Sequence, residues 1–93
     1  MTTDTLNAAM YTLGQLTRLV WPQGNIPENT VQTLLKAPVS GLIDILNAAE
    51  QTSVDRAWFK TLLWTLPNGF SDPKTDLPAE TQAYFWKGIR HSH

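Results

Sequence analysis

The amino-acid sequence predicts an all-α fold, a compact bundle of about five short helices, and three observations support this prediction. Apolar residues recur at spacings of three and four along each apolar stretch, which is the period of an α-helix. The prolines fall between these stretches, where helices begin or end. No stretch shows the sustained alternation or the β-branched run of a strand. A chain of 93 residues has the length of one domain, so we expect residues 1–93 to form a single helical domain.

The first predicted helix spans about residues 5–20, where Leu6, Met10 and Leu13 begin an apolar stripe. Gly14 lies in the middle of this helix, where glycine costs about 1 kcal/mol relative to alanine. We therefore expect Gly14 to mark a close approach between this helix and a second helix. The segment that follows, which begins with Trp21, has the composition of a turn.

Prolines set the limits of the next two predicted helices. The second helix spans about residues 27–36, and the third spans residues 38–50. Pro38 ends the one and begins the other, because the residue before a proline avoids the helical conformation while proline itself suits a first helical turn.

The fourth and fifth predicted helices span about residues 54–66 and 78–90. Thr52 or Ser53 is expected to cap the fourth helix by accepting a hydrogen bond from a free backbone amide. Because the fourth helix is the most hydrophobic of the five, we expect it to be central. The apolar stripes together predict a core that includes Leu13, Leu16, Leu35, Leu42, Leu46, Phe59, Leu62, Leu63 and Phe85.

Composition excludes several classes of protein. The chain has no cysteine, which rules out disulfides and thiol chemistry and fits a reducing compartment. It shows neither a signal peptide nor an apolar run long enough to span a membrane, so we expect a soluble, cytoplasmic protein without membrane contact. Seven basic and eight acidic residues give a net charge of −1, so a nucleic-acid surface would have to be local.

Catalysis is not expected, because no nucleophile can be paired with a base. The two histidines, His91 and His93, stand at the end of the chain, where a side chain is hard to hold rigidly. Two imidazoles alone do not complete a metal site, and the sequence contains no phosphate loop or dinucleotide motif. We therefore predict no catalytic residue, no metal and no cofactor.

Two groups of cations are candidates for phosphate contacts. Arg56 and Lys60 are four residues apart on one predicted helix, which places them on the same face. Lys87 and Arg90 lie in the last turns of the fifth helix, beside the terminal histidines. Each group has a structural alternative, because cations at a helix end also stabilise the helix dipole. The functional interpretation is that the four cations contribute to a weak basic face.

Four tryptophans are many for a chain of this size, and Trp21 and Trp86 are candidates for contacts with another protein. Trp21 stands beside a proline in a turn, and Trp86 lies away from the apolar face of its helix. The alternative for both is that the ring folds back over the edge of the bundle. Trp58 and Trp86 are also available to stack on nucleic-acid bases.

Three segments resemble one known family. Residues 11–16 (Tyr-Thr-Leu-Gly-Gln-Leu) are similar to the Tyr-x-Leu-Gly-Arg-Leu start of a helical domain, and residues 37–42 (Ala-Pro-Val-Ser-Gly-Leu) resemble a following proline-initiated helix. Residues 77–88 resemble an ending in which Leu-x-x-Glu-x-Gln-x-x-Phe-x-x-Gly precedes aromatic residues and His-Gln. This pattern is that of the C-terminal helical domain, or separate small subunit, of type I-C CRISPR surveillance (Cascade) complexes. Gln15 replaces the usual basic residue, and Ile89-Arg90 replaces the aromatic pair.

The resemblance implies a non-catalytic antiviral-defence subunit that contacts neighbouring protein subunits, occurs in several copies per complex and stabilises displaced-strand DNA. Single-stranded DNA and guide RNA would be its nucleic-acid partners. The residues implied in phosphate contacts are Arg18, Arg56, Lys60, Lys87 and Arg90. The alternative is a small protein–protein binding module, an adaptor or inhibitor from a mobile element, which makes no nucleic-acid contact.

Overall fold

The computed structural model describes residues 3–52, 54–67, 70–73 and 76–91, and these residues form five α-helices and no strand. The helices are α1 (Thr3–Val20), α2 (Glu28–Lys36), α3 (Pro38–Gln51), α4 (Arg56–Trp64) and α5 (Ala79–Arg90). The predicted all-α fold is therefore confirmed, and every predicted helix lies within two residues of an observed one at each end.

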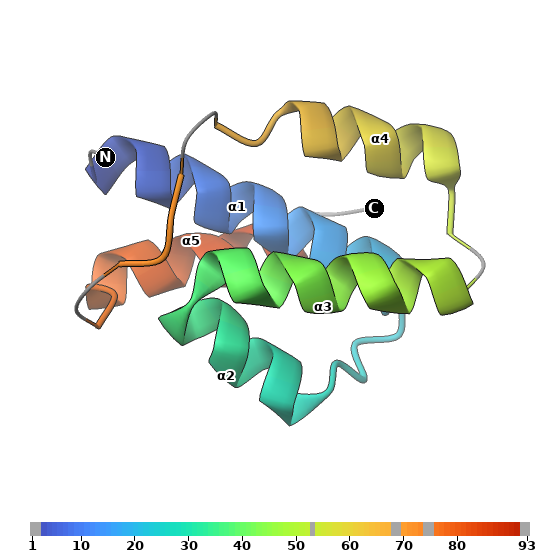
Figure 1. Ribbon diagram of the computed structural model, residues 1–93, viewed down its shortest axis with the longest axis horizontal. Coiled ribbons are helices and arrows are strands. Elements are labelled where there is room, and N and C mark those ends of the chain that lie inside the picture. The colour runs from blue at the N-terminus through green and yellow to red at the C-terminus, as the bar shows by residue number, and fades with distance from the viewer. Residues whose placement is uncertain (1–2, 53, 68–69, 74–75, 92–93) are drawn as a thin grey trace.

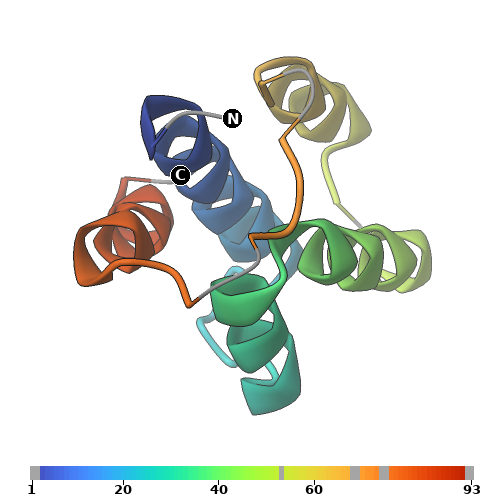
Figure 2. The same ribbon diagram turned by 60° about the vertical axis from the view of Figure 1, so that its left-hand side comes forward.

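The central helix is α1. Helices α3, α4 and α5 all pack against it, and α2 packs against α3 (Figures 1 and 2). Met10, Leu13 and Leu16 are completely buried on α1. The prediction that the fourth helix is central is wrong, because only Phe59 and Leu62 of α4 are buried. The sequence of α4 is apolar on several faces, and hydrophobic content does not show which face another helix covers.

Two glycines form the crossing between α1 and α5. A Cβ atom on Gly14 would overlap the backbone carbonyl of Phe85 and lie 3.0 Å from the amide nitrogen of Ile89. A Cβ atom on Gly88 would overlap the backbone carbonyl of Tyr11. The two backbones therefore approach more closely than they could if either glycine carried a side chain. The expectation that Gly14 marks a close approach between helices is confirmed.

Polar contacts hold the same crossing in register. The buried hydroxyl of Thr81 donates a 2.7 Å hydrogen bond to the side-chain oxygen of Asn7, so neither group is left unsatisfied. At the end of α5, the Tyr11 hydroxyl lies 3.1 Å from Nδ1 of His91, and the two rings meet edge to face. His91 thus rests on α1, whereas His93 lies outside the described residues.

The start of α4 differs from the prediction. The helix begins at Arg56, and Asp55 is its cap, since the Asp55 carboxylate accepts a 3.1 Å hydrogen bond from the amide of Trp58. Thr52 instead ends α3, and Ser53 lies outside the described residues. Aspartate is as good a cap as serine or threonine, and its position three residues before Trp58 gives the geometry that a cap needs.

Pro38 occupies the first turn of α3, as predicted. Pro27 and Pro78 stand one position earlier, at the residues that precede α2 and α5. The loop before α5 also contributes to α3, because the carboxylate of Asp72 accepts a 2.8 Å hydrogen bond from the amide of Val39. This bond satisfies a free amide at the start of α3 and ties the loop to the bundle.

Most of the predicted core is confirmed. Buried residues of the prediction are Leu13, Leu16, Phe59, Leu62 and Phe85, and partly buried ones are Leu35, Leu42 and Leu63. Leu46 is the exception, because 37% of its surface is exposed. On α3 the buried residues include Ile45 and Ala49, and this face packs against α1 and α2. Leu46 lies to one side of this buried face and is therefore partly exposed.

The α1–α5 crossing makes a prediction about stability. Gly14→Ala should destabilise the protein by about 1–3 kcal/mol, because the added methyl group meets backbone atoms that have no alternative rotamer. The loss should appear although alanine is the better helix former by about 1 kcal/mol. Urea unfolding would measure it, with Ala8→Gly at an exposed position of α1 as the control for helix propensity. A Gly14→Ala protein as stable as the parent would show that the crossing is looser than described.

Candidate interaction surfaces

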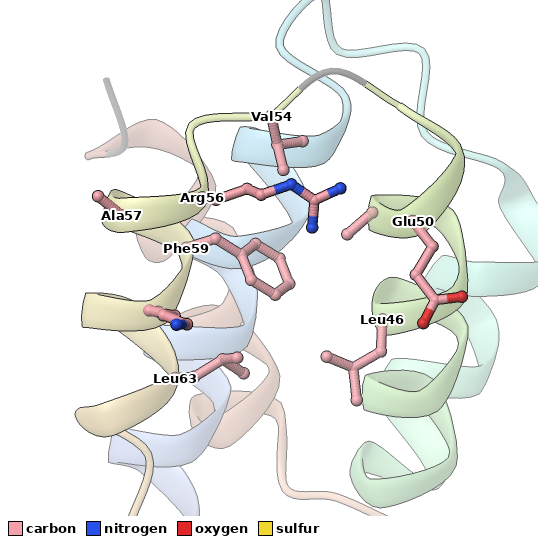
Figure 3. A pocket seen from close by; sticks show the side chains of 9 residues that line it. Leu46, Glu50, Val54, Arg56, Ala57, Phe59 and Leu63 are labelled. Atoms are coloured by element: carbon pink, nitrogen blue, oxygen red, sulfur yellow. The ribbon is translucent and has the colours of Figure 1, made fainter.

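An open groove separates α3 from α4. The two helices are consecutive in the chain, yet each packs on α1 and they make at most marginal contact with each other. The groove encloses a volume of about 720 Å³. The residues that line it are Leu46, Ala49, Glu50, Val54, Arg56, Ala57, Phe59, Lys60 and Leu63 (Figure 3).

The walls of the groove are largely apolar. Leu46 projects from α3, while Phe59 and Leu63 project from α4 (Figure 3). Beside the groove, Ile43 exposes 54% of its surface on α3. Apolar residues that cluster on an exposed surface are typical of sites that contact another protein.

Charges of both signs stand on the groove walls. Arg56 and Lys60 line it from α4, and Glu50 lines it from α3. Figure 3 shows the Arg56 side chain extending from α4 toward α3, while the Glu50 carboxylate points away from the Arg56 guanidinium. Within the part of the chain that the structure describes, Glu50 forms no ion pair with either cation. The predicted cation pair is therefore brought together, but in an apolar and mixed-charge setting.

Trp64 is the most exposed large apolar side chain among the described residues, with 86% of its surface accessible. It follows Lys60 by four residues and so lies on the same side of α4. Trp64 is not among the site residues predicted from the sequence. The signal that was available is the helical spacing, which sets Trp64 apart from the buried pair Phe59 and Leu62.

A second surface lies at the end of α5. Thr81, Phe85 and Gly88 are the buried residues of this helix, and at 100° per residue Trp86, Lys87 and Arg90 lie on the side away from them. These last three form the α5 patch. Trp86 exposes 43% of its surface. The Lys87 ammonium stands 4.7 Å from the centre of the Tyr84 ring, which holds it by a cation–π contact.

The remaining predicted site residues lie elsewhere. Arg18 is half-buried at the end of α1, where its guanidinium packs close to Gly24 in the following turn. Trp21 is also half-buried and packs against the core. In Figure 2, α4 and α5 lie on different sides of α1. The cations of α4 and of α5 therefore form two separate groups.

The described residues offer no cluster of three or more histidine, cysteine, aspartate or glutamate side chains that could bind a metal ion. In the same part of the chain, none of the helices combines the length and the apolar character that crossing a membrane requires. What the surface does offer is an apolar groove and a basic patch, and both are suited to binding.

No protein-family model, no curated protein and no solved structure matches this chain. The resemblance described above consequently depends on sequence motifs alone.

The groove makes a prediction about two neighbouring positions of α3. Ile45→Ala should cost about 2–5 kcal/mol, because the side chain is fully buried. Leu46→Ala should cost about 1 kcal/mol or less, because its side chain faces the groove and its removal leaves no enclosed cavity. Chemical unfolding at low protein concentration measures both. Equal losses at the two positions would show that the groove closes in solution.

Proposed function

We propose that this protein is a non-catalytic helical subunit of a nucleoprotein complex similar to type I-C CRISPR surveillance complexes. In this role it contacts neighbouring subunits and stabilises displaced single-stranded DNA. The observation that carries the proposal is the α5 patch, in which Trp86, Lys87 and Arg90 share the outward side of one helix end.

The chemistry of the α5 patch suits a single strand. An exposed indole stacks on an unpaired base without regard to its identity, and nearby cations bind the phosphates on either side. Trp86 and Arg90 are four residues apart, so they are neighbours on the helix surface. Gly88 lies between them in the sequence, and it is buried where it packs against the backbone of α1. The patch therefore stands on a helix end that is firmly held.

The residues of the resemblance also support a related fold. Gly14, from the first quoted segment, packs on α5 at Phe85, and Gly88, from the last, packs on α1 at Tyr11. The motif residues thus come together at one helix crossing, although they are far apart in the sequence. A chain that shares this motif would share the crossing, which makes these positions structural.

The low charge of the protein predicts that a single copy binds nucleic acid weakly. The net charge of −1 gives no long-range attraction to nucleic acid, and the α5 patch supplies only two cations. Several copies held side by side in a complex would add their contacts through effective concentration. The proposal therefore places the physiological contact in an assembly.

A second candidate function is a protein-binding module that makes no nucleic-acid contact. The α3–α4 groove and the exposed Trp64 favour it, because apolar surface and aromatic side chains are typical of protein interfaces. The two functions differ in their dependence on salt, since only phosphate contacts release counterions.

The α5 patch predicts a specific loss of nucleic-acid binding. Lys87→Glu with Arg90→Glu should weaken binding to a single-stranded oligonucleotide and reduce the slope of log affinity against log salt by about 1.4, at about 0.7 for each phosphate contact. Fluorescence anisotropy at several low salt concentrations measures both quantities. Trp86→Ala should weaken binding and leave the slope unchanged, because stacking releases no counterions.

The matched control is Arg56→Glu with Lys60→Glu, which changes the net charge equally on the other cation group. It also tests the phosphate contacts predicted for this pair from the sequence. We expect a smaller change in slope than for the α5 variant, because the α4 pair borders an apolar groove. If the α5 variant binds with unchanged affinity and slope, the nucleic-acid function is contradicted and the protein-binding module remains.

A further inference from the structure

We propose that the α3–α4 groove is the interface between two copies of this chain, related by a two-fold axis. In this dimer Glu50 of each copy faces Arg56 and Lys60 of the other. The inference goes beyond the proposed function and does not depend on it, because it concerns a different surface.

The apolar character of the groove argues for a protein occupant. Leu46 and Leu63 face the open space from opposite walls, and the flanking Ile43 is more than half exposed. Such side chains gain free energy when another apolar surface removes them from water. A nucleic-acid strand would leave the aliphatic side chains poorly covered, and its phosphates would meet Glu50 as well as the two cations.

The charges on the walls favour a second copy as the occupant. One wall carries an acid, Glu50, and the other carries two bases, Arg56 and Lys60, and within the described residues these charges are not paired across the groove. A two-fold axis through the groove sets α3 of one copy against α4 of the other. The same complementary contact then forms twice. A purely acidic or purely basic partner would meet a like charge on one of the walls.

The size of the two walls is consistent with a weak dimer. The 14 residues of α3 extend about 21 Å and the nine residues of α4 about 14 Å. Two helix faces of these lengths, each about 10 Å wide, offer less area than the roughly 800 Å² per partner of a standard interface. With a net charge of only −1, two copies repel each other little. We therefore expect a reversible dimer that dissociates on dilution.

Charge-reversal variants of the two groove walls, tested alone and as a mixture, test the interface directly. Sedimentation velocity of the full chain, without nucleic acid, should show dimers that increase with concentration. Glu50→Lys, and separately Arg56→Glu with Lys60→Glu, should each weaken dimerisation about tenfold or more, because like charges then face each other twice. An equimolar mixture of the two variants should recover the parental affinity as a heterodimer, because opposite charges face each other again at both contacts.

Control variants distinguish an effect of the groove charges from a general effect of net charge on dimerisation. Asp44→Lys makes the same change in charge at an exposed position of α3, and its spacing from the buried Ile45 and Ala49 places it on the flank away from Leu46. This variant and the α5 double variant should dimerise like the parent. Leu46→Glu should abolish the dimer while circular dichroism retains the helical spectrum, because the side chain is exposed in the monomer.

Two results would overturn the proposal. One is a chain that stays monomeric at every accessible concentration, which would assign the groove to a different protein. The other is a dimer that the groove variants leave intact, or whose loss mixing does not reverse. Neither result bears on the proposed function, because nucleic-acid binding by the α5 patch is measured separately and involves other residues.

Discussion

The close crossing of α1 and α5 is the constraint on which the rest of the structure depends. Gly14 and Gly88 each meet a backbone carbonyl of the opposite helix, so neither position has room for a side chain. The buried bond between Thr81 and Asn7 sets the register of the two helices. With one side of α1 occupied in this way, α3 and α4 must pack on what remains of its surface. The arrangement of the other helices follows from that limit.

The position of α4 shows the consequence. A nine-residue helix that packs on α1 through Phe59 and Leu62 buries only one of its faces. Its remaining apolar residues then face the groove or the solvent, as Leu63 and Trp64 do. The groove is thus a product of the packing around α1, in which the short helix α4 stands beside α3 without closing on it.

The two candidate surfaces differ in chemistry, and so they suit different partners. The α5 patch combines two cations with an exposed indole on a helix end that α1 holds in place. The groove combines apolar walls with charges of both signs. Because α4 and α5 lie on different sides of α1, one copy can use both surfaces at once (Figure 2). The proposed role in an assembly would use both surfaces, one for a neighbouring protein and the other for nucleic acid.

The sequence by itself determined the five helices, and their limits to within two residues, because helical periodicity and proline act over a few residues. It also indicated the close contact at Gly14, since a glycine inside a helix has a local cost that packing must offset. Only the tertiary structure decided which helix is central, that Leu46 is exposed, and that the cations of α4 and α5 stand apart. These features depend on which faces meet across the chain, and spacing along one helix carries no information about the helix that covers it.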